Sequence, residues 1–226
     1  MRQAMYNKIN PLILKAATQL LQKKFTCPFE ITTALFLSEP ERRNIVLRLK
    51  LHSDSVTMPK SVILKQSLPE QSDADDKDAY ARFARDWAGL QFLSDIQQNT
   101  HSLPQFYGGN KTHRFILIED LGHQHISLVD SLTHPYQEKA IAALSRFMQA
   151  LGRFHATSFG RTNTHDIILR KINKNAETLQ EDIDFTVNDL LPKLESTNQK
   201  LGLQVGMGWF YNFYLFYQLF IQLCDC

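Results

Sequence analysis

The sequence predicts an α+β fold built on a five-stranded antiparallel sheet. Three segments before residue 67 and two after residue 103 are short and rich in β-branched and aromatic residues, as strands are. Segments with apolar residues at three- and four-residue steps, as in helices, precede, separate and follow these two groups. Turns of a few residues make neighbouring strands antiparallel, and 226 residues, 43% of them hydrophobic, can bury a core.

The first segment, Gln3–Lys24, is expected to form an amphipathic helix that covers the sheet. Its apolar side chains share one side and its lysines surround the other. No acidic residue precedes Glu30, which is also a feature of organelle transit peptides, although those favour arginine and serine over lysine. The helix is the favoured interpretation and the transit peptide is the alternative.

Three strands are expected next, at Phe29–Leu37, Asn44–His52 and Ser61–Gln66. The second alternates between apolar and polar residues, which is the pattern of a half-buried strand. Ser38–Arg43 and Asp54–Pro59 contain proline and polar residues and form the turns between the strands. The three strands therefore make an antiparallel meander.

A cation and a carboxylate are expected to meet between the third strand and the helix after it. Strand alternation places Lys65 on the same face as Ile63. Asp86 lies on or beside the apolar stripe of the helix, where a carboxylate is costly to desolvate without a cationic partner. We expect Lys65 to be that partner; the alternative is that both side chains simply extend into solvent. The stripe consists of Tyr80, Phe83, Trp87, Leu90 and Leu93.

The acidic stretch before this helix, Leu68–Asp78, has two interpretations. Ser72 or Asp73 would cap the helix, with the other acidic residues near its positive end, or the carboxylates would bind a cation. The cap is the favoured interpretation.

Two more strands, at Leu103–Gly109 and Arg114–Gly122, complete the sheet. The last one breaks at its Glu-Asp-Leu-Gly end, which exposes main-chain donors and acceptors that can hydrogen-bond a planar heterocycle. The alternative is a strand that ends at a glycine turn. A long helix, Gln137–Phe159, follows, with His155 on its apolar face, where packing is favoured over catalysis.

Five short motifs occur in a definite order along the chain. They are Val62–Lys65, Phe83–Asp86, Leu103–Gly108, Ile116–Gly122 and Leu151–Ala156. Together with the order of the elements, they resemble the kinase-like small-molecule phosphotransferases, which include aminoglycoside phosphotransferases, choline kinases and ecdysteroid-kinase-like proteins.

The resemblance implies a protein-kinase-like fold of two lobes. Residues 1–118 would be the small lobe, with the five-stranded sheet and one helix, and residues 119–122 would be the hinge connector. Residues 123–226 would be an incomplete helical large lobe with an aromatic tail.

The resemblance also implies an ATP site. Lys65 would contact the α- and β-phosphates, and Asp86 would be its ion-pair partner. The family normally has glutamate there, so the shorter Asp86 would need a closer helix or a bridging water. The turn Ser38–Arg43 has no glycine, unlike the phosphate-covering turn of many kinases.

The adenine end of the site would lie at the connector. The resemblance implies that the main-chain carbonyl of Glu119 and the amide of Leu121 read the adenine edge. Ile118 would line the back of the pocket, and Ile63 would face the nucleotide from the sheet above.

The chemistry half of the family pattern is absent from the sequence. The family uses a His-Gly-Asp loop, an asparagine five residues later and a further aspartate that binds magnesium. His165–Asp166 is the nearest match, but Lys171 stands where the asparagine is needed. We therefore assign no catalytic and no metal-binding residue, although the family implies ATP with magnesium.

The C-terminal segment Leu201–Cys224 carries no formal charge and is rich in aromatic residues. A buried helix of a truncated larger lobe, a tail read in a shifted frame and a membrane span are the alternatives. Glutamine and asparagine interrupt the segment, so the span is the least favoured of them.

The favoured function is that of an ATP-dependent phosphotransferase acting on a hydroxyl of an unidentified small molecule, in a chain expected to be inactive alone. A non-catalytic nucleotide- or partner-binding pseudokinase is the first alternative, and membrane association through residues 201–224 is the second. The net charge of +2 indicates no nucleic-acid partner. Three cysteines are too few for a disulfide framework, which favours the cytoplasm.

Overall fold

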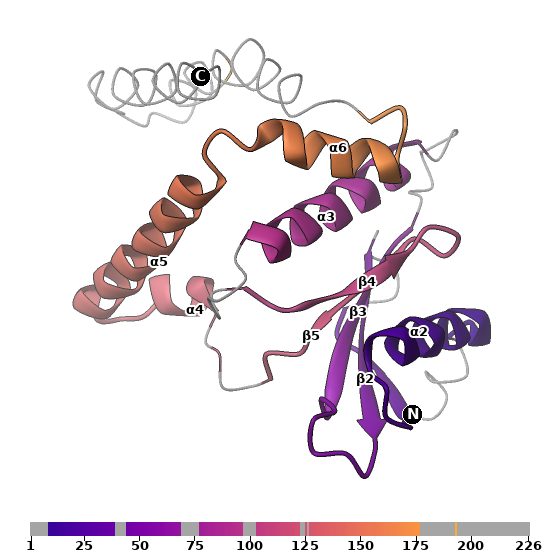
Figure 1. Ribbon diagram of the computed structural model, residues 1–226. Coiled ribbons are helices and arrows are strands. Elements are labelled where there is room, and N and C mark those ends of the chain that lie inside the picture. Colours follow the sequence, from indigo (N-terminus) through magenta and orange to yellow (C-terminus); the bar gives the residue numbers. More distant parts are fainter. Residues whose placement is uncertain are drawn as a thin grey trace.

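The computed structural model describes residues 9–38, 44–68, 77–96, 103–122, 125, 127–176 and 193. The expected cap at Ser72 or Asp73, most of the Ser38–Arg43 turn and the Leu201–Cys224 segment lie outside these residues. The elements in chain order are α2 Pro11–Lys24, β1 Glu30–Phe36, β2 Asn44–His52, β3 Ser61–Ser67, α3 Lys77–Ile96, β4 Phe106–Asn110, β5 Phe115–Glu119, α4 Leu128–Leu132, α5 Gln137–Ser158 and α6 Thr162–Ile172 (Figure 1).

The centre of the described structure is a five-stranded sheet with the strand order β1-β2-β3-β5-β4. Every neighbouring pair is antiparallel. β5 lies between β3 and β4 because the chain leaves the sheet after β3, forms α3, and returns at the edge of the sheet. The α+β class and the five-stranded antiparallel sheet predicted from the sequence are confirmed.

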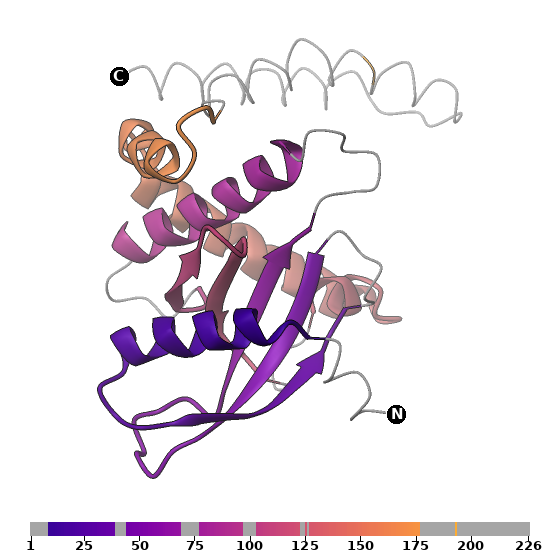
Figure 2. The same cartoon turned by 90° about the vertical axis from the view of Figure 1, so that its right-hand side faces the viewer.

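One face of the sheet is covered by α2, as Figures 1 and 2 both show. The Asn10 side chain caps this helix by accepting a hydrogen bond from the Leu12 N–H at 2.9 Å, and Pro11 occupies its first turn. Ala17 and Leu21 of α2 are fully buried against Val62 and Leu64, which alternate along β3. The interpretation of this segment as an amphipathic covering helix is therefore confirmed from Pro11 onward.

The opposite face of the sheet carries α3, and α6 packs on α3 (Figure 1). The Trp87 ring lies over β4, where a side chain at Gly109 would collide with it. Phe83 and Ile116 are buried here, and the Tyr80 hydroxyl donates a hydrogen bond to the Ile172 carbonyl at 2.9 Å. Two apolar cores therefore flank one sheet, and in β5 successive side chains alternate between them, with Ile116 in one core and Leu117 in the other.

Helix α5 differs from the sequence-based expectation. Its periodic apolar residues, which include Phe147 and Met148, are largely exposed, and within the described part of the chain Ala143 is its only buried residue. Among the described elements, α4 and, to a smaller extent, α3 contact this helix. His155, expected to pack at the end of this helix, is exposed.

Candidate functional site

Lys65 and Asp86 form a direct ion pair. The Lys65 Nζ donates a hydrogen bond to Asp86 Oδ2 at 2.6 Å. Lys65 lies on β3 and Asp86 lies in the first half of α3, so the pair joins the sheet to the helix. Neither a bridging water nor a glutamate is needed, because α3 packs closely enough for the shorter carboxylate to reach. The two residues predicted to meet are thus brought together.

The pair is accessible to solvent. The Lys65 side chain is 31% exposed and that of Asp86 is 36% exposed, whereas the neighbouring Val62 and Leu64 are fully buried on the other face. An ammonium group has three N–H donors, and Asp86 Oδ2 accepts one of them. The carboxylate therefore orients the lysine while leaving donors that can meet an anion.

A continuous row of side chains leads from Lys65 to the connector after β5. Ser61, Ile63 and Lys65 share one face of β3 because residues two apart in a strand point the same way. Ile63 stands opposite Ile118 in the β3–β5 register, and both are half-buried. At about 3.3 Å per residue, the row from Ser61 to Lys65 is about 13 Å long. Ile63 and Ile118 therefore offer an apolar surface between a polar end and a cationic end.

The main chain of the connector offers a donor and an acceptor. The Glu119 N–H donates to the Gln105 carbonyl at 2.8 Å, and the Gln105 N–H donates in return to the Glu119 carboxylate Oε2 at 3.0 Å. The main-chain carbonyl of Glu119 therefore does not accept from this amide. Among the described residues, the Leu121 N–H has no acceptor either. The Glu119 carbonyl and the Leu121 N–H are the two main-chain groups that the family resemblance implies for binding the adenine edge.

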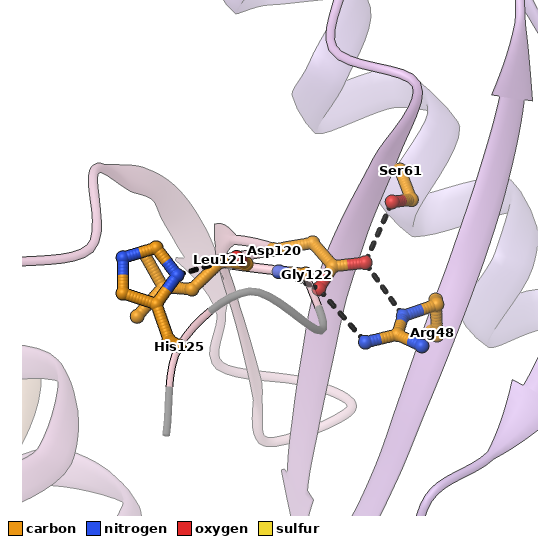
Figure 3. Close-up of polar contacts among 6 residues, drawn as sticks. All are labelled: Arg48, Ser61, Asp120, Leu121, Gly122 and His125. Atoms are coloured by element: carbon orange, nitrogen blue, oxygen red, sulfur yellow. Dashed lines mark hydrogen bonds and ion pairs between the residues drawn. The ribbon is translucent and has the colours of Figure 1, made fainter. Parts of the chain in front are cut away.

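Asp120 stands between these two groups and is the least exposed carboxylate of the site, at 5%. It accepts hydrogen bonds from Arg48 Nε on β2 at 2.6 Å and from the Ser61 hydroxyl on β3 at 2.6 Å (Figure 3). Arg48 Nη2 also donates to it at 3.0 Å, as does the Gly122 N–H at 3.0 Å. Beside this network, His125 Nδ1 donates to the Leu121 carbonyl at 2.7 Å.

The network sets the charge of Asp120. Burial acts to raise its pKa, but the hydrogen bonds from Arg48, Ser61 and the Gly122 amide, together with the positive charge of Arg48, outweigh burial and hold the pKa below its ordinary value. Sequence reasoning missed this network. The one sequence feature that points to it is Arg48, a cation between the apolar Leu47 and Leu49 of a predicted strand, and in the structure its guanidinium contacts Asp120.

The other candidates from the sequence do not join this site. His165 and Asp166 lie in helix α6, where the His165 ring packs edge-on against Phe92. His155 lies in the last turn of α5. Within the described ranges, no group of three histidine, cysteine or acidic residues is placed to hold a metal ion.

No protein-family model matches the sequence, and no curated protein matches it either. None of the helices in the described part of the chain is long and apolar enough to cross a membrane.

Proposed function

We propose that this chain binds ATP on the face of the sheet that carries Lys65, as a member of the kinase-like small-molecule phosphotransferases. The proposal includes their two-lobed organisation, with residues 1–118 as the small lobe, 119–122 as the hinge and 123–226 as part of the helical lobe. The observation that carries it is the 2.6 Å contact between Lys65 Nζ and Asp86 Oδ2.

The phosphate end of the ligand is argued from the exposure of this pair. Asp86 holds the Lys65 ammonium in one direction, and the lysine side chain remains about one third exposed, so an anionic ligand can reach it from solvent. A fixed ammonium with two remaining donors is suited to the oxygens of a phosphate chain. The Lys65 side chain is therefore the proposed contact for the α- and β-phosphates.

The base end of the ligand is argued from the connector. The Glu119 carbonyl can accept a hydrogen bond from an exocyclic amine, and the Leu121 N–H can donate one to a ring nitrogen. Ile63 and Ile118 provide apolar contact for a planar ring. An elongated ligand with a heterocycle at one end and an anionic chain at the other matches this order of groups, and adenine nucleotides have this chemistry.

Phosphoryl transfer to a small-molecule hydroxyl is the reaction that the family resemblance suggests. It requires a carboxylate at the acceptor hydroxyl and oxygen ligands for magnesium. Among the described residues no group of three histidine, cysteine or acidic side chains is placed to hold a metal ion, and no magnesium ligand is assigned in this chain. The proposal for this chain is therefore nucleotide binding, and no transfer step is derived from its residues.

Replacing Lys65 by methionine tests the proposal. Isothermal titration calorimetry of the full chain with ATP should show binding that Lys65→Met weakens at least about ten-fold, because a charge-assisted contact to phosphate is lost. Lys15→Met is the matched control, since Lys15 is exposed on α2, on the far side of the sheet. An ATP affinity that Lys65→Met leaves equal to that of Lys15→Met would overturn the site.

A further inference from the structure

We propose that Arg48, Asp120 and Ser61 form a clasp that positions the connector for recognition of the base, with Asp120 as a positioning residue. The inference rests on the proposed function and adds to it the source of base selectivity. The clasp ties three parts of the chain to one carboxylate, namely β2, β3 and the connector (Figure 3).

The position of Asp120 in the main chain gives it this role. The Glu119 carbonyl belongs to the peptide unit before Asp120, and the Leu121 N–H belongs to the peptide unit after it. Each peptide unit is planar, so the φ and ψ angles of Asp120 alone set the angle between the two groups. A side chain that fixes Asp120 therefore fixes the donor and the acceptor relative to each other.

The carboxylate is fully used by the protein. A carboxylate has about four acceptor positions, and four hydrogen bonds of 2.6 to 3.0 Å occupy them here. With its side chain 5% exposed, Asp120 has no free oxygen for a ligand. Its effect on a bound base must therefore pass through the connector.

The Lys65–Asp86 and Arg48–Asp120 ion pairs differ in exposure, which suits the first to ligand binding and the second to positioning the connector. The Lys65–Asp86 pair is about one third exposed and uses one of the three lysine donors, so it can bind a ligand directly. The Arg48–Asp120 pair has exposed fractions of 15% and 5% and uses two nitrogens of the guanidinium in a forked contact. Such a contact restricts geometry, and a preorganised connector loses less freedom when the base binds.

The geometry also predicts which base is preferred. An acceptor followed by a donor matches the exocyclic amine and the ring nitrogen N1 of adenine, whereas guanine presents a carbonyl and an N–H in those places. Selectivity for ATP over GTP then depends on how strictly the two main-chain groups are held. Loosening the clasp should reduce this selectivity and leave the phosphate contact intact.

The test compares the affinities of the full chain for ATP and GTP, measured by calorimetry in wild type and variants. Asp120→Asn keeps the shape of the side chain and its bond from Gly122 but loses the charge that holds Arg48. We expect it to reduce the ATP-to-GTP affinity ratio roughly ten-fold. Lys65→Met should weaken both nucleotides equally and leave the ratio unchanged. Asp54→Asn, at an exposed turn carboxylate, is the control.

A second readout needs no nucleotide. Hydrogen exchange of the hydrogen-bonded amides of Glu119 and Gly122 should be faster in Asp120→Asn, because a loosened connector opens more often, while peptides from β2 and β3 exchange as in wild type. Ser61→Ala, which removes one of the four bonds, should give a smaller change in the same direction and replaces Asp120→Asn if that variant does not fold.

The outcomes separate the two proposals. If wild type binds neither nucleotide, or Lys65→Met changes neither affinity, the proposed function is wrong. If Lys65→Met weakens both nucleotides but the clasp variants leave the ATP-to-GTP ratio and the connector exchange as in wild type, the positioning role is wrong and the proposed function stands.

Discussion

At the scale of single residues, Tyr107 shows how the fold changes the chemistry of a side chain. Tyr107 lies on β4 with its ring against Phe25, and the residue is 8% exposed. Burial, and secondly the negative charge of Glu119, raise the pKa of Tyr107 to about 12. The folded protein therefore keeps this phenol neutral at pH values where an unfolded chain would ionise it.

This shift predicts a loss of stability in alkali. Between the ordinary pKa of 10 and the folded value of about 12, the unfolded state has lost the Tyr107 proton while the folded state retains it. Stability is therefore fully present below pH 10 and falls as the pH rises towards 12, by on the order of 2 kcal/mol. Tyr107→Phe should lack this component of the decrease.

Urea unfolding at pH 9 and pH 11 measures this effect. Tyr136→Phe is the control, because Tyr136 is 64% exposed. The two variants should lose different amounts of stability between the two pH values, with the smaller loss in Tyr107→Phe. Equal losses would show that the Tyr107 phenol is not protected from ionisation.

The residues of the candidate site differ in how far the sequence could predict them. Lys65 and Asp86 were paired correctly because alternation in a strand and periodicity in a helix both fix the direction of a side chain. Asp120 lies within the sequence motif Ile116–Gly122, but its partners Arg48 and Ser61 are 72 and 59 residues away. Contacts of such separation depend on strand order, which local patterns do not contain.

At the scale of elements, the contact of α3 with β4 depends on the absence of a side chain at Gly109. A Cβ atom there would lie 2.5 to 2.8 Å from three ring atoms of Trp87. Gly109→Ala should therefore destabilise the protein by about 1–3 kcal/mol, because the ring or the strand must move. The free energy of unfolding from urea titrations measures the loss.

The control for this prediction lies in the same helix as Trp87. Nothing lies within 4 Å of a Cβ atom at Gly89, which is inside α3. Gly89→Ala should raise stability by about 0.5–1 kcal/mol, because alanine is the better helix former. Combining Gly109→Ala with Trp87→Leu should cost less than the sum of the single changes. A neutral Gly109→Ala would show that the packing of α3 on β4 is loose.

The elements also show where sequence patterns stop being informative. β2 was predicted with its exact bounds, Asn44–His52, because one of its faces packs on a core and alternation is strong there. The apolar side of α5 predicted a helix correctly, but not burial, since burial depends on which element lies opposite. Helix α6 was not predicted; its buried residues are Ile168, Leu169 and Ile172.

At the scale of the whole molecule, one sheet separates two cores. Adjacent residues of β5 belong to different cores: Leu117 faces α2 and Ile116 faces α3. Both are almost fully buried, at 0% and 2% exposure. The proposed nucleotide face needs both sides, because the α2 core fixes the strands while α3 supplies Asp86.

If the sheet couples its two faces, the described elements unfold together. Leu117→Ala removes side-chain volume only from the α2 core and should cost about 2–5 kcal/mol. In a coupled structure, this loss lowers the hydrogen-exchange protection of α3 amides by the same factor as that of α2 amides, since both are exposed by one opening reaction. Ile116→Ala, which alters the other core, should give the same pattern. If the α3 amides of the Leu117→Ala protein instead keep the protection that they have in wild type, the two faces of the sheet open separately. The Lys65–Asp86 ion pair could then break while the sheet stays folded.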